Sequence, residues 1–253
     1  MTIKIAKLIH GDCLKKMLEL PENSVDMILA DPPYGTTACK WDAVIDLKKM
    51  WDCINFVTKK NIAIVLFCQQ PFTSRLISSN YNMYKYMWYW RKNRPSGFVN
   101  AKLKPLKDIE EIVVFSNGTT ANGSDKNMPY FPQGLKEVNK SWSRPKRYGD
   151  GKGVNCSRKT HKLKRTIKYE NYPRQVLDYN KHNKKLLHPT QKPIPLLQYL
   201  IKTYTNENDT VLDFCFGSCS TGVACKKTNR NFIGIEKDEQ YFNIGTERLQ
   251  NDN

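Results

Sequence analysis

Apolar runs of strand length alternate with helical segments near both ends of this chain, and this alternation limits the folds that it can adopt. Near the N-terminus, residues 25–30 (VDMILA) and 63–67 (AIVLF) are separated by a helical segment at 47–58. Near the C-terminus, residues 210–214 and 231–236 flank another helical segment. Apolar strands joined by helices are typical of a parallel sheet that is covered on both faces. We therefore predict an α/β fold.

The other predicted elements follow from the same periodicities. We expect further strands and helices at 3–9, 12–20, 84–90, 111–115, 193–204 and 238–250, with a polar loop at 91–107. A chain of 253 residues is long enough for one catalytic domain with a full-sized core. The sequence contains no apolar run long enough for a membrane span, and residues 1–10 lack the apolar block of a signal peptide. We expect a cytoplasmic protein that has no membrane partner.

The eight cysteines are scattered through apolar runs and form no paired CxxC motif. Structural zinc sites normally use closely spaced pairs of ligands, and Cys215, Cys219 and Cys225 do not have that spacing. We expect buried, reduced thiols and no metal. The histidines are better explained as surface or loop residues than as ligands.

The formal net charge is +17, and most of the excess lies in about a third of the chain. Residues 117–192 contain 18 Lys and Arg against 5 Asp and Glu. A field of this kind favours a polyanionic partner, because neutralised phosphates release condensed counterions. Charge alone does not distinguish DNA from RNA or anionic lipid, and a solvated lysine-rich surface is the alternative. Periodicity fades at 117–187, so we predict a functional insertion there.

The segment DFCFGSCSTG (residues 213–222) begins at the end of the predicted strand at 210–214 and continues as a turn that contains glycine and serine. In a doubly wound sheet such a turn lies at the carboxyl ends of the strands, where ligands bind. Gly217 allows the backbone to approach a ligand, and the amides at the start of the next helix can meet a carboxylate. Glu236 follows the next strand, where an acid accepts hydrogen bonds from ribose hydroxyls in nucleoside-binding folds. Together these features indicate a nucleoside cofactor.

The segment Asp31-Pro32-Pro33-Tyr34 follows the predicted strand at 25–30. Two prolines fix the backbone and remove two N–H donors, which leaves carbonyls as acceptors. A carboxylate beside those carbonyls can hold the hydrogens of an amine, and the tyrosine ring can stack on a planar heterocycle. A rigid turn with Asp31 as a cap is the structural alternative. The presence of a nucleoside turn in the same chain favours the functional interpretation.

Three motifs together resemble the amino-methyltransferases of bacterial and phage DNA modification. They are DPPYG, HPTQKP, and VLDFCFGSCSTG followed by FIGIEKDEQYF, and their order is that of the beta class. The resemblance covers nearly all of the chain except 117–187. It implies a Rossmann-like, S-adenosylmethionine-dependent fold with a mostly parallel seven-stranded sheet, helices on both faces and circularly permuted motifs. It also implies a catalytic half at 1–116, a basic target-recognition insertion at 117–187 and a cofactor-binding half at 188–253.

The resemblance also assigns site residues. It implies that Asp12 approaches the cofactor's adenine, that Glu236 holds its ribose, and that Thr190 and Lys192 approach its carboxylate. The rest of the cofactor pocket is then expected to comprise Asp213, Phe214, Gly217, Ser218, Ser220 and Thr221. The family usually has DPFxGSGT at the turn, whereas Phe214 and Cys219 here replace the proline and the second glycine. If Cys219 adopts a positive φ, that conformation is more costly than it would be for glycine.

The implied reaction is methyl transfer to N6 of adenine in a base that is flipped out of double-stranded DNA. Tyr34 would stack on the base, while Asp31 and the carbonyl of Pro32 would orient the amine for direct in-line transfer. C5-cytosine methylation needs a cysteine nucleophile, and Cys68 in CQQP does not fit, because its proline comes after it. N4-cytosine methylation stays open, since Asp before Pro-Pro-Tyr favours adenine with exceptions. Methylation of RNA or of protein glutamine, and a silent DNA-binding module, are further alternatives.

We expect DNA contacts from two basic segments, the one around residues 90–97 and the insertion that follows. Their cations would mainly bind phosphates, with a few side chains contacting base edges. The predicted contact residues are Arg91, Lys92, Arg94, Arg144, Lys146 and Arg147. By analogy with the family, a homodimer and a restriction endonuclease partner are also expected.

Overall fold

A computed structural model describes residues 6–35, 43–143, 164–180 and 191–251. The chain forms two compact units. The first comprises 1–131 and 175–253, and the second comprises 132–174. The second unit lies inside the predicted insertion but is shorter than it. The flanks of that insertion belong to the first unit, where Met128 and Leu177 are buried.

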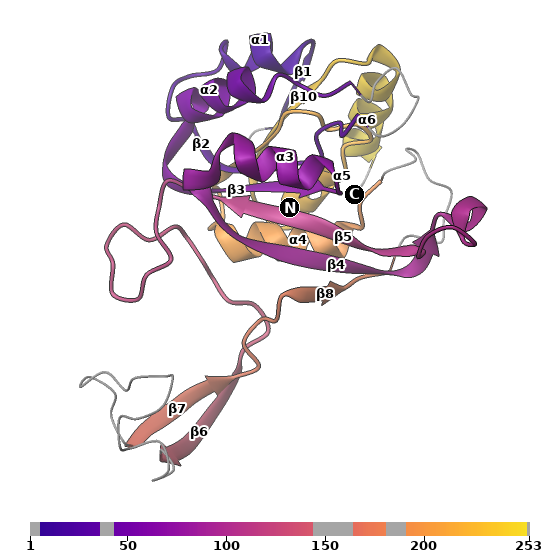
Figure 1. The fold of residues 1–253 in the computed structure, drawn as a ribbon. Coiled ribbons are helices and arrows are strands. Elements are labelled where there is room, and N and C mark those ends of the chain that lie inside the picture. Colours follow the sequence, from indigo (N-terminus) through magenta and orange to yellow (C-terminus); the bar gives the residue numbers. More distant parts are fainter. Residues whose placement is uncertain (1–5, 36–42, 144–163, 181–190, 252–253) are drawn as a thin grey trace. The chain divides into compact units, whose positions relative to one another are not determined.

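The first unit is built on one eight-stranded sheet with the order β1-β10-β9-β2-β3-β5-β4-β8 (Figure 1). The strands from β1 to β3 in this order are parallel, β5 is antiparallel to both of its neighbours, and β8 is parallel to β4. The sheet has one strand more than expected, because β8 pairs with residues 89–91 of β4. The strands are β1 (Ala6–His10), β2 (Val25–Ala30), β3 (Thr58–Cys68), β4 (Tyr84–Ser96), β5 (Lys107–Phe115), β8 (Val176–Asp178), β9 (Thr210–Asp213) and β10 (Asn231–Glu236).

Helices cover both faces of this sheet, as the apolar runs indicate. Successive side chains of β2 point to opposite faces, so Ile28 joins one core cluster while Met27 and Leu29 join the other. The first cluster includes side chains of α1 (Cys13–Met17), α2 (Leu47–Val57) and α3 (Phe72–Ser79). The second includes side chains of α4 (Ile194–Tyr204), α5 (Ser220–Lys226) and α6 (Glu239–Asn251). No helix in the described part of the chain is both long and apolar enough to cross a membrane.

One local expectation was wrong, and one helix was missed. Residues 91–96 and 107 belong to strands and not to a polar loop, because β4 and β5 continue pairing from Arg91↔Ile109 to Ser96↔Lys107. The short helix α3 was not predicted. A 3-10 turn, η2 (Phe98–Asn100), lies between β4 and β5, and another, η1 (Tyr81–Met83), precedes β4.

The second unit contains an antiparallel pair, β6 (Lys136–Ser143) and β7 (Lys164–Glu170). Lys140 and Glu170 form an exposed ion pair across this hairpin, with 2.6 Å between Nζ and Oε2. The exposed side chains of Lys136 and Lys168 also belong to these strands. Part of the expected irregular insertion is therefore a two-stranded sheet. The predicted DNA-contact residues Arg144, Lys146 and Arg147 lie outside the described residues.

Candidate active site

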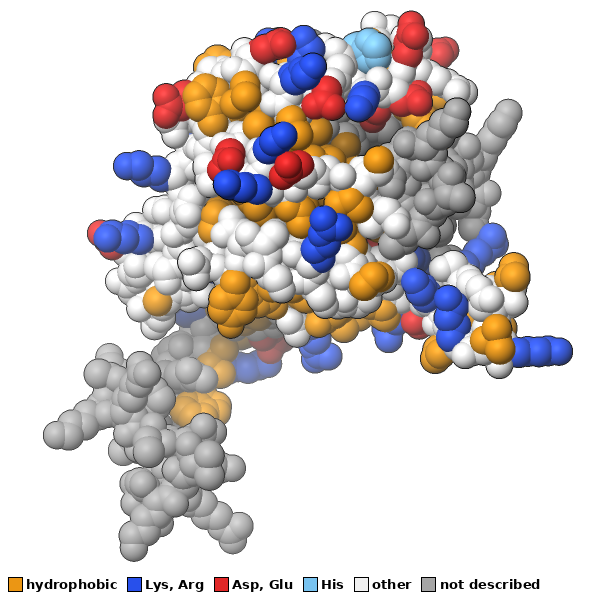
Figure 2. Space-filling view, turned by 45° about the horizontal axis from the view of Figure 1, so that its top comes forward, with side chains coloured by type: hydrophobic (Ala, Val, Ile, Leu, Met, Phe, Trp, Pro, Cys, Tyr) orange, Lys and Arg blue, Asp and Glu red, His pale blue; other side chains and the backbone are white. Residues whose placement is uncertain are grey.

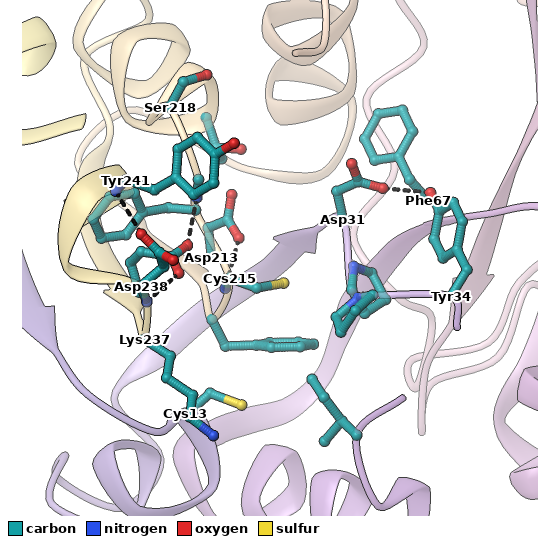
Figure 3. A pocket seen from close by; sticks show the side chains of 18 of the residues that line it. Cys13, Asp31, Tyr34, Phe67, Asp213, Cys215, Ser218, Lys237, Asp238 and Tyr241 are labelled. Atoms are coloured by element: carbon teal, nitrogen blue, oxygen red, sulfur yellow. Dashed lines mark hydrogen bonds between the residues drawn. The ribbon is translucent and has the colours of Figure 1, made fainter. Parts of the chain in front are cut away.

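A pocket of about 670 Å³ lies at the carboxyl ends of the parallel strands (Figure 3). Its walls come from the segments that follow β1, β2, β9 and β10 and from the start of α4. Asp31 and Gly217, which are far apart in the sequence, both line it. The predicted site residues that line it are Asp12, Asp31, Pro32, Pro33, Tyr34, Lys192, Asp213, Phe214, Gly217, Ser218, Ser220, Thr221 and Glu236. Thr190 lies outside the described residues.

One side of the pocket is formed by the glycine turn after β9 and the acidic end of β10. Gly217 has a φ of 51°, and its amide donates to Glu236 Oε2 at 2.8 Å. The other carboxylate oxygen of Glu236 accepts from the amide of Asp238 at 2.8 Å. Glu236 therefore ties together the two loops that form this wall. The arrangement places a fixed carboxylate beside exposed backbone, which suits the hydroxyls of a nucleoside.

Cys219 does adopt the left-handed conformation, with a φ of 58°, and it caps the N-terminus of α5. The conformation costs roughly 1–2 kcal/mol for a residue other than glycine. Two glycines make room for its side chain. A Cβ on Gly222 would lie 2.5 Å from Cys219 Sγ, and one on Gly245 would lie 3.0 Å from Cys219 Cβ. The glycine missing at 219 is thus compensated by glycines that pack against the cysteine.

Asp213 is almost completely buried at the end of β9. Burial raises the pKa of its carboxyl group to about 7, although a hydrogen bond from Thr221 and one from the amide of Cys215 oppose the shift. The carboxylate accepts from the Cys215 amide at 3.2 Å. This acid therefore titrates near neutral pH in the folded protein, which is typical of functional sites.

The raised pKa of Asp213 predicts how stability depends on pH. A carboxyl group with a raised pKa in the folded state costs stability as the pH rises from its unfolded pKa through the folded value. The pKa of Asp213 rises from 3.8 to about 7 on folding, so the free energy of unfolding falls by about 4 kcal/mol between pH 4 and pH 7. We expect Asp213→Asn, without cofactor, to become progressively more stable than wild type from pH 5 to pH 8. Parallel melting-temperature curves for the two proteins would contradict this assignment.

The opposite side of the pocket carries the Asp31-Pro-Pro-Tyr34 corner, which directly follows β2 (Figure 3). The Tyr34 hydroxyl donates a hydrogen bond to Asp31 Oδ1, and Lys192 Nζ donates to Asp31 Oδ2 at 2.7 Å. The Tyr34 ring stacks on Phe72, with 5.4 Å between centroids. Burial raises the pKa of Asp31, and the neighbouring Lys192 opposes this shift. The corner therefore presents a carboxylate whose ionisation depends on the lysine.

Lys192 belongs to a row of alternating buried charges. Its ammonium lies 2.7 Å from Glu110 Oε1 as well as 2.7 Å from Asp31, and Lys92 lies 3.0 Å from Glu110 Oε2. None of these four side chains is more than 22% exposed. Burial alone would raise the pKa of Glu110, but Lys192 and Lys92 hold it below its usual value. The row Asp31–Lys192–Glu110–Lys92 is neutral overall, so each charge is compensated by a neighbour.

This row contradicts the expectation for Lys92 and gives Lys192 two partners within the protein. Lys92 was expected to contact DNA, but it is buried and its ammonium binds Glu110, which leaves it no exposed charge for a phosphate. Lys192 was expected to approach a cofactor carboxylate. Its ammonium binds Asp31 and Glu110 and lies 4.9 Å from the centroid of the Phe67 ring, and the residue also lines the pocket, so that expectation stays a prediction. Lys192 thus contacts Asp31 directly, whereas Lys92 is linked to it only through Glu110 and Lys192.

The other described residues of the expected DNA-contact set are exposed. Arg91 makes a two-pronged ion pair with Asp178, with nitrogen–oxygen distances of 2.5 and 3.0 Å. Arg94 lies farther along β4 and is also exposed. Arg91 thus forms its ion pair with the outermost strand of the sheet, β8, whereas the side chain of Arg94 is exposed to solvent.

Sequence reasoning missed several residues of the site. Asp238 and Tyr241 line the pocket at the start of α6, where the Tyr241 amide donates to Asp238 Oδ1 at 3.1 Å. The acid two residues after Glu236, before a helix, was a usable signal for Asp238. Phe67 and Cys215 were seen only as parts of apolar runs. No sequence signal identified Glu110, because its partners come from distant segments.

Two cysteines of the described part of the chain, one at the end of β3 and one in the pocket, are candidates for a nucleophile, and neither is activated. Cys68 is buried at the end of β3, and burial raises the pKa of its thiol to about 12. Cys215 lines the pocket, and burial raises its pKa well above the usual value as well. A thiolate is the nucleophilic form of cysteine, so neither thiol suits attack on a base. Among the described residues, no group of three or more His, Cys, Asp or Glu side chains is arranged to hold a metal ion.

Comparisons with known proteins place this pocket in a family context. A family model described as DNA methylase, of the N6/N4 type, matches residues 25–247. The chain is 28% identical over 257 residues to the DNA adenine methyltransferase YhdJ of Escherichia coli K12, which covers 96% of this chain and 82% of that protein. It is 25% identical to the type II methyltransferase M2.LlaDCHI of Lactococcus lactis subsp. cremoris, over 96% of this chain and 89% of the relative.

Solved structures agree with the fold. The crystal structure of the M1.HpyAVI–SAM complex superposes with a TM-score of 0.62 at 26% identity, covering 96% of this chain and all of that one. The cytosine-N4-specific PvuII DNA methyltransferase superposes with a TM-score of 0.65 at 14% identity, over all of this chain and 89% of that one. The second likeness concerns the fold alone.

Proposed function

The chain belongs to the DNA methylase family of N6/N4 amino-methyltransferases, and from this premise we propose that it transfers a methyl group from S-adenosylmethionine to N6 of adenine in double-stranded DNA. One observation carries the proposal. The Asp31–Tyr34 corner and the glycine turn at Gly217 line the same pocket, so an amine at one wall can meet a cofactor at the other.

The residues of the glycine-turn wall fit the cofactor. Glu236 and the turn at Gly217 would hold the ribose, Asp12 would approach the adenine, and Asp213, which is buried, also lines this part of the pocket. The pocket volume of about 670 Å³ lies in the range of small-molecule and cofactor sites. When bound, S-adenosylmethionine supplies a methyl group activated by a sulfonium.

The residues of the opposite wall would hold the flipped base. Tyr34 offers its ring to the base, and Asp31 with the Pro32 carbonyl accepts the hydrogens of the exocyclic amine. In the structure, both Asp31 oxygens already accept hydrogen bonds, from Tyr34 and Lys192. The arriving amine therefore shares or replaces the bond of the Tyr34 hydroxyl. Because a carboxylate is too weak a base to deprotonate a neutral aromatic amine first, Asp31 orients the lone pair. Once the nitrogen carries the methyl group and a positive charge it is a strong acid, and its proton passes to the Asp31 carboxylate and then to solvent.

The choice of adenine is supported by two observations. Asp precedes Pro-Pro-Tyr in this chain, and a relative over 96% of the chain is a DNA adenine methyltransferase. N4-cytosine is the second candidate, because the matching family model covers both kinds of base.

Transfer of a tritiated methyl group to unmethylated genomic DNA, followed by nucleoside analysis, tests the proposal. We expect the label in N6-methyladenine. Label in N4-methylcytosine would overturn the choice of base. No label in DNA despite binding of the cofactor would overturn DNA methylation itself and favour RNA or a silent module; tRNA and rRNA assayed in parallel separate these two.

The basic character of the second unit predicts salt-dependent DNA binding. Each phosphate contact contributes about −0.9 to the slope of log K against log salt. Replacing the exposed Lys136 and Lys168 by glutamine is expected to reduce the magnitude of that slope by up to about 2. Filter binding of duplex DNA at several salt concentrations measures it, with Lys48→Gln on α2 as a surface control. A flat salt response in wild type would contradict the role given to this unit.

The family resemblance also motivates two proposals on partners. A homodimer would be seen by light scattering as twice the mass of the chain. A restriction endonuclease partner would cleave the same site in unmethylated DNA, and protection by this methyltransferase would abolish that cleavage.

A further inference from the structure

The β4–β5 hairpin ends in a structured tip at residues 97–106, here called the hairpin tip. Gly97 has a φ of 95° and redirects the chain, and no atom lies within 4 Å of a Cβ added there. The amides of Asn100 and Lys104 donate to the carbonyls of Gly97 and Asn100 at 3.0 and 3.1 Å. These backbone hydrogen bonds therefore give the tip a defined conformation, which fixes the positions of the Cα atoms that carry its side chains.

Large apolar side chains of the hairpin tip face solvent. Phe98 is 67% exposed, Val99 99% and Leu103 83%. Exposed apolar side chains that are grouped in this way mark interaction sites more often than scattered ones do. Figure 2 shows hydrophobic side chains beside Lys and Arg at this end of the molecule, at the lower right of the view.

The hairpin tip is also basic. No acid occurs between residues 93 and 107, whereas the exposed cations of this stretch are Arg94, Lys102, Lys104 and Lys107. Two copies of this surface brought together around a twofold axis would set like charges against each other. A polyanion, in contrast, would complement them. The charge thus favours a nucleic acid over a second copy of the chain.

The hairpin tip projects from the edge of the sheet that carries the pocket. Cys68 at the carboxyl end of β3 pairs with Glu111, so the residues of β5 that precede Glu111 extend past that edge. Lys107 Nζ donates to Gln69 Oε1 at 3.1 Å, just beyond β3. Glu110 contacts Lys192 at the pocket wall, and Lys107 lies three positions earlier in β5, a distance of about 10 Å along the strand. The base of the hairpin tip therefore lies at the same ends of the strands as the pocket, and Glu110 and Lys192 connect it to Asp31.

We propose that the hairpin tip is the wedge that enters the base stack of DNA beside the target and keeps the target base out of the duplex. This inference rests on the proposed function. Phe98, Val99 and Leu103 replace the stacking that is lost on flipping, as apolar wedges do in proteins that unstack duplex DNA. The surrounding lysines bind the phosphates on either side. The tip supplies the apolar surface, and the pocket receives the base.

The test uses the full chain and a synthetic duplex that contains the methylated sequence, which is first mapped by sequencing wild-type-treated DNA. The wedge variant is Phe98→Ser/Val99→Ser/Leu103→Ser, which should fold because these side chains are exposed. Its single-turnover methylation of the matched duplex should fall by about tenfold or more, because unstacking is no longer compensated. On a duplex with an abasic position opposite the target base, the target base is already unpaired. The methylation rate of the wedge variant on this duplex should therefore be within about threefold of the wild-type rate.

Two controls separate a wedge from other roles. Lys102→Gln/Lys104→Gln should weaken binding to both duplexes equally, because phosphate contacts do not depend on pairing of the target. Tyr81→Ser removes another aromatic side chain, which is 72% exposed. It lies in η1, just before β4 and therefore at the other end of that strand from the hairpin tip, so the methylation rates on both duplexes should stay unchanged. Absence of methylation by wild type on any DNA would instead refute the proposed function.

Three outcomes would overturn the wedge. They are an unchanged rate for the serine variant, an equal loss on matched and abasic duplexes, and conversion of a wild-type dimer to a monomer by the serine substitutions. The last would show that the hairpin tip contacts a second copy. A loss on the matched duplex together with recovery on the abasic duplex would establish the wedge.

Discussion

Asp31→Ala is expected to lower methyl transfer by a factor on the order of a hundred to a thousand while leaving cofactor binding nearly intact. Asp31 is the group that would accept the hydrogens of the amine, and removal of one preorganised polar group from a closed site has an effect of this size. Its contacts are with Tyr34 and Lys192 rather than with the glycine turn, so the cofactor wall keeps its structure. Single-turnover rates and calorimetric binding of S-adenosylmethionine measure the two effects.

Asp31→Asn is the matched control. It keeps the shape and one acceptor but loses the charge beside Lys192, so a loss intermediate between wild type and alanine is expected. Equal losses of transfer and of cofactor binding in Asp31→Ala would instead assign Asp31 to the cofactor.

Lys192→Met should destabilise the protein and abolish transfer together. The substitution leaves Asp31 and Glu110 buried without the cation that lies 2.7 Å from each. Breaking a buried ion pair by removal of one partner typically costs about 3–5 kcal/mol. Without the lysine, burial raises the pKa of Asp31 against the hydrogen bond from Tyr34 alone, so the charged form that accepts the amine hydrogens becomes less favourable.

The sign of the pH dependence distinguishes this explanation from simple loss of packing. Carboxyl groups with raised pKa values in the folded state stabilise it at low pH and lose that contribution as the pH rises. Lys192→Met should therefore be closer to wild type in stability at pH 5 than at pH 8. In wild type the lowered pKa of Glu110 acts in the opposite direction, so its stabilisation is lost as the pH falls.

A second variant tests the row of charges directly. Lys192→Met/Glu110→Gln removes one uncompensated carboxylate and should recover part of the stability without recovering transfer. Denaturant unfolding at pH 5 and pH 8 measures this, with Lys48→Met as a surface control. A pH-independent loss that the second substitution does not relieve would show that Lys192 acts only through packing.

The part of the fold that could be predicted depended on local pattern. Residues 25–30 and 231–236 were predicted with the bounds that the structure shows, because strands buried on both faces are continuous apolar runs. The family context of the motifs, confirmed by the comparisons, placed the Asp31 corner and the glycine turn in one fold. The pairing of β4 beyond Arg91 was missed because polar residues continue a strand only where a partner such as β5 exists.

In the site, too, contiguous motifs could be predicted, whereas residues that depend on partners from distant segments could not. The glycine turn and the Asp31 corner are contiguous segments with their own signals, and both line the pocket. Lys92 and Glu110 carry no such signal, since a charged residue in a strand looks solvent-exposed until its partner is known. Their burial depends on contacts between β4, β5 and the start of α4 that no single segment encodes. The prediction of Lys92 as a DNA contact failed for this reason.

A crystal structure with S-adenosylhomocysteine is the most direct test of the central claim, that one pocket joins the amine corner to the cofactor turn. The claim predicts a ribose held by Glu236 and a sulfur facing Asp31 across the pocket, with space between them for a methyl group and an amine. A cofactor bound elsewhere, or a sulfur directed away from Asp31, would contradict it.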